Sequence, residues 1–344
     1  MEAAYWKCPK TFAPNDAIFI LTIFVSCVSL LANLTVFILL CILTDKSRTF
    51  LVHLRTLTAS TALCSLMGFF RHVIPRRGAP NSPILGTIVC HVWSSRYLFD
   101  VTYVFSGLNL NFIVGNRALQ ISGKYQDSFA PSLFSDLTYV IIIGISSIFC
   151  VFSQVFVVQW NGSYCACNDT DLKYGAVVAA YVGNFVRFGL VAVISPAILC
   201  ASCYKIVQWV RNTPAEKLSD DWNGPIFPGT TDEQAVELHR PRRWMTASMC
   251  AVPMSVKFVV FSLYNAIYSF TAALGLHTLV LDGVYYRIGS VLIYTELLLS
   301  PIIIAIYIPS LRALLLRVCK WPFNKLLNKA PAIAGNESGD LQIP

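Results

Sequence analysis

Residues 17–43 read AIFILTIFVSCVSLLANLTVFILLCIL, a run without a single charged side chain. An α-helix needs about 20 predominantly apolar residues to cross the hydrocarbon core of a bilayer. In lipid, every backbone N–H and C=O must find its partner within the protein, and a helix meets this demand within one segment. This stretch therefore predicts a membrane-spanning helix.

Six further apolar runs follow, covering residues 51–70, 86–113, 137–158, 176–207, 245–274 and 288–308. Of the 344 residues, 56% are apolar and 13% charged, and the mean hydropathy is +0.60. Soluble domains have roughly 25% charged residues. We expect an all-α membrane protein, a seven-transmembrane helix bundle over 17–308. An outer N-terminus (1–16), a short amphipathic helix (309–322) and a cytoplasmic tail (323–344) complete it.

The basic residues are distributed unequally between the loops. If the N-terminus is outside, the inner loops and tail hold sixteen of the 26 Lys and Arg residues and the outer side holds six. Cytoplasmic loops are enriched in Lys and Arg, so this difference predicts N-out, C-in. The net charge of +8 is then charge on the cytoplasmic side of a lipid membrane. Basic residues scattered among spans argue against nucleic-acid binding.

The predicted outer side carries the sites of covalent modification. Two glycosylation sequons, Asn161-Gly-Ser and Asn168-Asp-Thr, fall in the loop after the fourth run. The N-terminal residues before the first run are polar, and that run is too long for the core of a signal peptide. We therefore expect it to remain in the protein as a signal anchor.

Four of the twelve cysteines lie on the predicted outer side: Cys8, Cys90, Cys165 and Cys167. An even number of cysteines in an oxidising compartment favours disulfides. A bridge from Cys90 to either Cys165 or Cys167 would tie the loop over the bundle mouth, and Cys8 could take the other; the sequence leaves the pairing open. Zinc is a weaker alternative because Cys-Ala-Cys spacing is tight and no histidine flanks it. We expect no metal or other cofactor.

The end of the third run, Ser106–Ile121, reads SGLNLNFIVGNRALQI. Together with the seven runs and the cysteine Cys90, it resembles the rhodopsin-like (class A) G-protein-coupled receptors, which have Ser-x-Leu-x-Leu and then Asp-Arg-Tyr here. In this chain the triplet begins Asn116-Arg117. The resemblance implies that both residues lie at the cytoplasmic end of the third span, where Arg117 contacts a heterotrimeric G protein on activation.

Further positions carry the same resemblance. Asn33 matches the asparagine of span one, and Pro196 with Tyr204 matches the proline and tyrosine of span five. Ser300-Pro301 stands where the family has Asn-Pro in span seven. The resemblance implies that Tyr204 takes part in G-protein coupling and that Ser300 and Pro301 belong to the switch that responds to ligand.

The segment after span seven alternates apolar and basic residues at helical spacing. Its apolar positions are Leu311, Leu314, Leu315 and Val318. This pattern is typical of an amphipathic helix that lies along the inner membrane surface. Cys319 in this segment is a palmitoylation candidate.

Several positions depart from the family pattern. Thr61 stands where the family has a sodium-binding aspartate, and Ser300 replaces an asparagine of the same site. The stretch Phe261–Tyr268 lacks the Cys-Trp-x-Pro of span six. These departures imply a divergent or lineage-specific receptor, with an invertebrate orphan receptor as one option, whose sodium site lacks its charge.

Five residues are assigned to a ligand pocket: Arg96, Phe99, Asp100, Tyr103 and Tyr268. Charges inside a membrane are costly and point to function. Amine receptors of this family use an aspartate near this depth, but counting from the arginine puts Phe99 there and Asp100 one residue further, about 100° around the helix. Alternatively, Arg96 pairs with Asp100 four residues later on one helix face, the interpretation we favour.

Lys257 and Glu296 lie within the sixth and seventh runs. Unpaired, each would be strongly destabilising or would change its protonation state. They either pair across the two spans, forming a bridge that locks an inactive state, or Lys257 extends to the inner surface and Glu296 is protonated. Arg187 in the fifth run has no evident partner in the sequence.

We therefore expect a plasma-membrane receptor that binds an extracellular ligand of unknown class and activates heterotrimeric G proteins. A transporter or channel is the alternative, with Asp100, Arg187 and Glu296 along a path, although the chain has no internal repeat. A retinal protein is excluded because span seven has no lysine. An enzyme is not expected, since the histidines do not cluster and no nucleophile or phosphate motif is present.

The neutral neighbour of Arg117 leads to a testable prediction. Because Asn116 cannot form a salt bridge with Arg117, basal signalling should be higher than with an acidic neighbour. Asn116→Asp should therefore lower the basal level of second messenger in transfected cells. An unchanged or higher basal level at equal surface expression would contradict this prediction.

Overall fold

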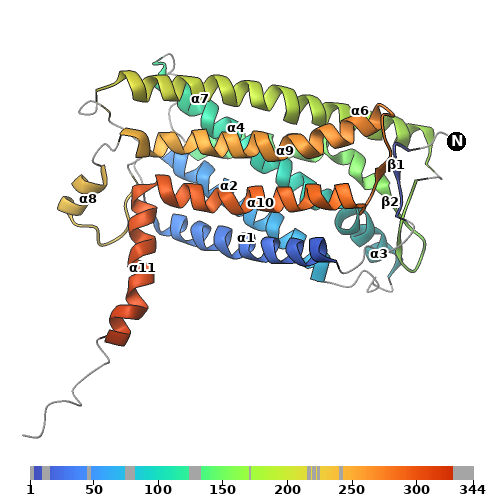
Figure 1. The fold of residues 1–344 in the computed structure, drawn as a ribbon, viewed down its shortest axis with the longest axis horizontal. Helices are drawn as coiled ribbons and strands as arrows, with labels where there is room; N and C mark the ends of the chain where they lie inside the picture. Colours follow the sequence, from blue (N-terminus) through green and yellow to red (C-terminus); the bar gives the residue numbers. More distant parts are fainter. Residues whose placement is uncertain are drawn as a thin grey trace, which may run out of the picture.

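The computed structural model describes residues 4–9, 16–44, 48–73, 82–123, 133–169, 172–214, 218, 222, 225–239 and 243–327. Within these ranges, seven helices are long and apolar enough to cross a membrane. Figure 1 shows the long helices running along the longest axis of the molecule. The chain is a multi-pass membrane protein with an all-α, seven-helix bundle, as its sequence predicts.

The bundle is built from eight α-helical segments, because the fifth span consists of two of them joined by a wider, π-helical turn, Gly189–Ile194. These segments are α1 (Ala17–Ile42), α2 (Arg48–Val73), α4 (Tyr97–Ile121), α5 (Leu133–Cys150), α6 (Tyr174–Phe188), α7 (Ser195–Asn212), α9 (Ala251–Ala273) and α10 (Val284–Tyr307). Shorter elements are α3 (Pro83–Val89), α8 (Asp232–His239), α11 (Pro309–Leu327), β1 (Trp6–Lys7), β2 (Val158–Trp160), β3 (Cys165–Cys167) and β4 (Leu279–Val280).

The third predicted span, 86–113, is wrong in its boundaries. The chain breaks at Ser95 and Arg96, and the spanning helix α4 runs on to Ile121. Arg96 has a left-handed backbone (φ 67°), and the hydroxyl of Ser95 accepts a hydrogen bond from the backbone N–H of Tyr97 at 3.1 Å. Serine often competes with helical hydrogen bonding in this way. Hydropathy cannot register such a local break.

The fourth predicted span, 137–158, also ends too late. Helix α5 stops at Cys150, and a 3₁₀ turn, Phe152–Val157, leads into strand β2. This run stays apolar after the helix ends because β2 and the 3₁₀ turn pack against other elements of the same end of the bundle. The remaining predicted spans match their helices to within six residues at each end.

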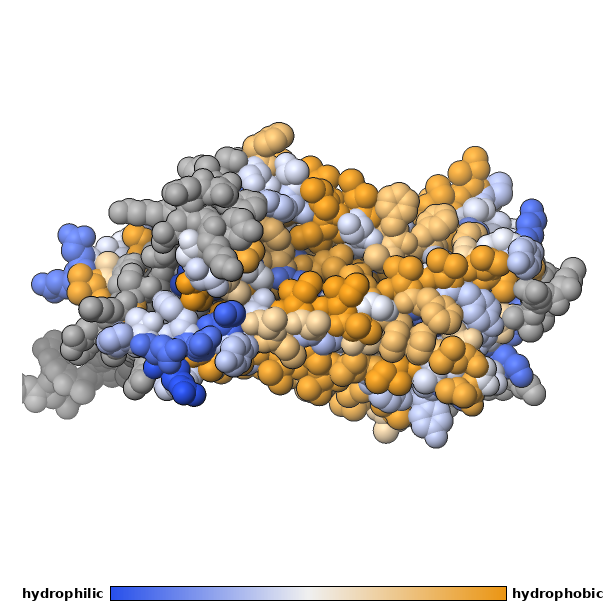
Figure 2. Space-filling model, turned by 90° about the horizontal axis from the view of Figure 1, so that it is seen from above, coloured by the Kyte–Doolittle hydropathy of each residue, from blue (hydrophilic) through white to orange (hydrophobic). Residues whose placement is uncertain are grey.

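Burial distinguishes the central helices from those that face lipid. The apolar windows of α2 and α4 are 61% buried, whereas that of the fourth span, which contains α5, is 17% buried. Figure 2 shows apolar surface along the middle of the molecule and hydrophilic residues gathered near its two ends. This distribution suits a bilayer around the middle of the bundle.

One end of the bundle, the strand end, holds all four strands (Figure 1). There β1 pairs in parallel with β4, and β2 pairs antiparallel with β3. Disulfides join Cys8 to Cys167 and Cys90 to Cys165, with Cα–Cα separations of 5.7 and 5.4 Å. The structure thus chooses one of the pairings that the sequence left open.

The opposite end, the α11 end, is crossed by the last helix (Figure 1). Leu311 and Leu314 of α11 are buried, whereas Val318 and the free Cys319 are exposed. The helix predicted at 309–322 is therefore present and extends to Leu327. The tail from residue 328 lies outside the described residues.

Close packing of α4 against α9 gives a prediction about stability. A Cβ atom on Gly107 would lie 2.7 Å from Cε2 of Phe258, a ring that is only 3% exposed. Gly107→Ala should therefore destabilise the bundle by about 1–3 kcal/mol, the usual cost of overpacking.

Gly115 on the same helix is the matched control, because a Cβ there meets nothing within 4 Å. Gly115→Ala should be neutral or slightly stabilising, since alanine favours helix. Thermal unfolding of both variants in detergent measures the difference. Equal unfolding midpoints for the two variants would show that the α4–α9 contact does not restrict the size of the side chain at position 107.

Candidate functional site

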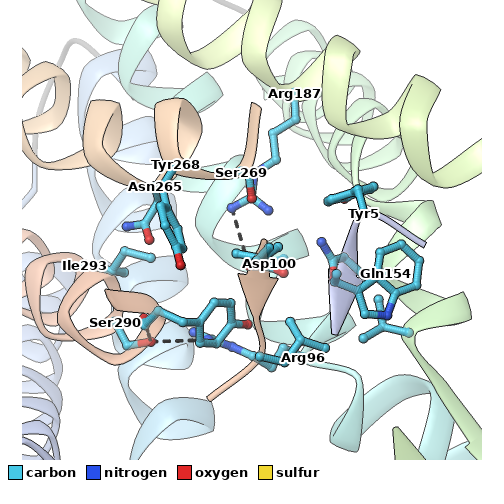
Figure 3. Close-up of a pocket in the computed structure, with 15 residues that line it drawn as sticks. Tyr5, Arg96, Asp100, Gln154, Arg187, Asn265, Tyr268, Ser269, Ser290 and Ile293 are labelled. Carbon is cyan, nitrogen blue, oxygen red and sulfur yellow. Dashed lines mark hydrogen bonds and ion pairs between the residues drawn. The ribbon is translucent and has the colours of Figure 1, made fainter. Parts of the chain in front are cut away.

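A pocket at the strand end lies among α4, α6, α9 and α10 and is closed by residues of the N-terminal segment and of β4 (Figure 3). Its empty volume is about 600 Å³, including the part that is open to the outside. The free cavity volume inside it is about 50 Å³, which leaves room for a small polar group of a ligand.

The charged groups of the pocket do not pair as we expected. Arg187 Nη2 lies 3.7 Å from Asp100 Oδ1, so Arg187 has the partner that the sequence did not reveal. The predicted Arg96–Asp100 pair is absent. That prediction placed both residues in one helix, but Arg96 precedes α4 with a left-handed backbone, which directs its side chain elsewhere.

Arg96 is 9% exposed and extends across the pocket towards Ser290, whose Oγ lies 3.2 Å from its Nη1 (Figure 3). Its guanidinium carbon lies 4.8 Å from the ring centre of Phe99 and 5.0 Å from that of Tyr286. Its buried Nε has no hydrogen-bond partner among the residues that the structure describes. Within the described part of the chain, no carboxylate lies within ion-pair distance of Arg96.

The N-terminal segment closes the pocket with Tyr5 and Trp6. Trp6 Nε1 donates to the carbonyl of Asn168 at 2.9 Å, and the N–H of Cys8 donates to Asp169 Oδ2 at 2.8 Å. Together with the Cys8–Cys167 disulfide, these bonds hold the segment in place. Burial raises the pKa of Tyr5, so its phenol is neutral at physiological pH.

Three of the five predicted pocket residues line the cavity: Arg96, Asp100 and Tyr268. Phe99 instead packs against Tyr294, with ring centres 5.7 Å apart. Tyr103 lies deeper, where its hydroxyl donates to Glu296 Oε2 at 2.7 Å. Both lie on α4 but on faces turned into the protein core.

Sequence analysis missed several lining residues, among them Tyr5, Trp6, Tyr286 and Ser290. The first two belong to a short polar segment before the first span and carry no pattern. Arg187 was the one available signal, because a charge inside an apolar run is itself a functional hint.

Below the pocket, a buried ion pair joins α9 to α10. Lys257 Nζ lies 3.3 Å from Glu296 Oε1 and 2.5 Å from Ser300 Oγ. Lys257 is 7% exposed, so of the two alternatives that the sequence left open, the pairing across the spans is present and the lysine does not extend to the surface. With Tyr103, the network connects three helices.

Pro301 lies inside α10 and lacks the N–H that would bond to the carbonyl of Leu297. Asn33 on α1 takes this place, because its Nδ2 donates to that carbonyl at 3.0 Å. Thr61 Oγ1 in turn donates to Asn33 Oδ1 at 2.7 Å. The amide of Asn33 thus acts as donor and acceptor at once and connects α1, α2 and α10.

At the α11 end, Arg117 is 4% exposed. Its Nε donates to Ser248 Oγ at 2.6 Å, and its guanidinium carbon lies 5.4 Å and 5.2 Å from the ring centres of Trp209 and Trp222. Asn116 is half-buried beside it. Tyr204, which we grouped with Arg117, is 66% exposed and is not brought to it.

The predicted modification sites differ in accessibility. Asn161 is exposed, whereas Asn168 is half-buried and accepts the bond from Trp6 through its carbonyl; Thr170 of its sequon lies outside the described residues. Cys319 is exposed on α11. No three His, Cys, Asp or Glu side chains form a metal-binding group in the described ranges.

Comparison with known proteins adds no family. No protein-family model matches the chain, and a search of curated proteins found no match. The roles of the site residues therefore rest on the chemistry and geometry of this chain.

The buried pair gives a quantitative prediction. Lys257→Met should destabilise the bundle by about 3–5 kcal/mol, because removing one partner leaves an uncompensated buried charge. Glu296→Gln should also destabilise it, and the double variant should lose less than the sum of the single variants.

Thermal unfolding of the single and double variants in detergent completes this cycle. Lys205→Met is the control, since Lys205 is exposed on α7, and it should leave the midpoint nearly unchanged. Strictly additive losses would mean that Lys257 and Glu296 are not energetically coupled.

Proposed function

We propose that the chain is a G-protein-coupled receptor of the plasma membrane, with its N-terminus outside. In this proposal an extracellular ligand binds in the pocket at the strand end, and a heterotrimeric G protein binds at the α11 end. The observation that carries it is the position of Arg117, buried at the α11 end of α4 and held by contacts that can be released.

Helix α4 supports a connection between the two ends. It carries Asp100 at the pocket, Tyr103 in the ion-pair network and Arg117 at the far end. Tyr103 lies about one turn from Asp100 and donates to Glu296. A ligand that favours another arrangement of these residues would shift the bundle towards a second state.

The loop between α7 and α8 supplies the proposed restraint on Arg117. Trp222 of this loop is buried and stacks on Phe50 with ring centres 4.0 Å apart. Thr44 and Ile226 exchange two backbone hydrogen bonds of 2.8 Å, which hold the loop against the bundle. In the proposed inactive state, Trp222 and Ser248 hold Arg117 in place. In the receptors that this chain resembles, the acidic residue before the arginine does this.

Three features support the proposed orientation. By sequence, sixteen of the 26 basic residues fall in the loops and tail that the N-out topology makes cytoplasmic, as expected of that side. The two disulfides lie at the strand end, and disulfides persist in oxidising compartments. The exposed sequon asparagine, Asn161, lies in the same loop as Cys165 and Cys167.

A transporter or channel is the competing proposal. The buried pairs Asp100–Arg187 and Lys257–Glu296 would suit the path of an ion or solute, since charges within membrane spans often mark such paths. The same experiment separates the two proposals.

The test is ligand-free nucleotide exchange in membranes that contain the chain and one member of a panel of G proteins. Exchange should be present with the parent chain and lost in Arg117→Ala. Trp222→Ala should raise it several-fold, because the ring that covers Arg117 is gone.

Trp244→Ala is the matched control, since Trp244 is 48% exposed, and it should leave exchange unchanged at equal surface expression. Exchange that does not depend on Arg117 would contradict the receptor proposal. Ion or solute flux that persists in Arg117→Ala would favour the transporter.

A further inference from the structure

We infer that the pocket at the strand end binds a small organic monocarboxylate, whose negative group pairs with the guanidinium of Arg96. The inference rests on the proposed function of this pocket as the ligand site and names the chemical class of the ligand.

Among the described residues, the charges that line the pocket leave one positive charge in excess. Its charged side chains are Arg96, Asp100 and Arg187, and Arg187 pairs with Asp100 at 3.7 Å. The nearby carboxylate of Asp282 lies 3.9 Å from Arg71. A single negative charge supplied by a ligand would complete the pocket.

Arg96 has the properties of a residue that is prepared for an anion. It is 91% buried, since only 9% of it is exposed, and its Nε has no partner. Ser290 and two aromatic rings stabilise the guanidinium only in part. A guanidinium presents a planar fork of N–H groups that matches the two oxygens of a carboxylate.

The backbone of Arg96 supports this interpretation independently. Its φ of 67° is unfavourable for a residue with a side chain, and such strain often persists at ligand-binding positions. The left-handed turn separates Arg96 from Asp100 and directs it towards Ser290 (Figure 3). The protein thereby keeps this guanidinium away from the pocket's own carboxylate.

The remaining walls indicate a compact apolar body for the ligand. Trp6, Tyr268, Tyr286, Leu279 and Ile293 contribute aromatic and aliphatic surface, and the N-terminal segment limits the size. A protonated amine is disfavoured, because Asp100 is already paired with Arg187 and the guanidinium of Arg96 would repel it. A phosphate dianion is also disfavoured, because it would bring two negative charges to a pocket with one excess positive charge.

The experiment measures binding to the purified full chain in detergent by thermal unfolding. The probes are aliphatic and aromatic monocarboxylates, each compared with its primary amide, its amine analogue and, where one exists, its phosphate ester. We expect monocarboxylates to raise the unfolding midpoint with concentration and their amides and amines to have no effect.

Variants assign the effect to Arg96. Arg96→Gln should weaken carboxylate binding by about 10- to 100-fold, the value of a charged hydrogen bond. Arg287→Gln is the matched control at the same end, since Arg287 pairs with Asp16 at 2.8 Å and does not line the pocket; it should bind as the parent does. The Asp100→Asn variant should bind carboxylates more tightly than the parent chain. Misfolding of a variant would weaken binding, so it could not produce this result.

The inference would be overturned if no carboxylate stabilised the parent chain, or if amides, amines or phosphate esters stabilised it as much as carboxylates do. Unchanged carboxylate binding in Arg96→Gln or weaker binding in Asp100→Asn would also overturn it. The assay contains no G protein. If carboxylates do not bind but nucleotide exchange depends on Arg117, only the ligand class is overturned. If carboxylates bind through Arg96 but exchange does not depend on Arg117, only the receptor proposal is overturned.

Discussion

Polar groups inside a membrane protein must find partners within the bundle, because lipid offers none. Several buried polar side chains of this protein meet that demand across helices. Lys257 and Glu296 join α9 to α10, and Asn33 satisfies the carbonyl that Pro301 leaves open. The helices are therefore held in register by specific polar contacts as well as by apolar packing.

The same constraint makes buried polar groups with unused hydrogen-bonding capacity informative about function. Arg96 is buried with an unpartnered Nε, while Asp100 has been taken by Arg187. A buried guanidinium that lines a cavity and keeps an unused donor marks the place where an anionic ligand is expected. Helix α4 connects this place to Tyr103 and, at its far end, to Arg117.

Both ends of the bundle are closed by segments outside the spans. Tyr5 and Trp6 cover the pocket at the strand end, and Trp222 covers Arg117 at the α11 end. In the described structure the chain itself thus covers both proposed binding surfaces. A G protein would have to displace Trp222, whereas the N-terminal segment remains as a wall of the ligand pocket. Because α4 joins the two ends, a ligand in the pocket can favour release of Arg117 at the other.

The sequence by itself determined the seven spans and the amphipathic helix and marked Lys257 and Glu296 as buried charges that need an explanation, because long apolar runs and charges within them follow from the membrane alone. Only the structure showed that these two side chains pair. The sequence could not place the break at Ser95 and Arg96, which depends on backbone dihedrals and a local hydrogen bond. Nor could it choose the disulfide pairing, the partner of Asp100 or the positions of Trp6 and Trp222. Those contacts join residues far apart in the chain, and only the packing of the helices brings them together.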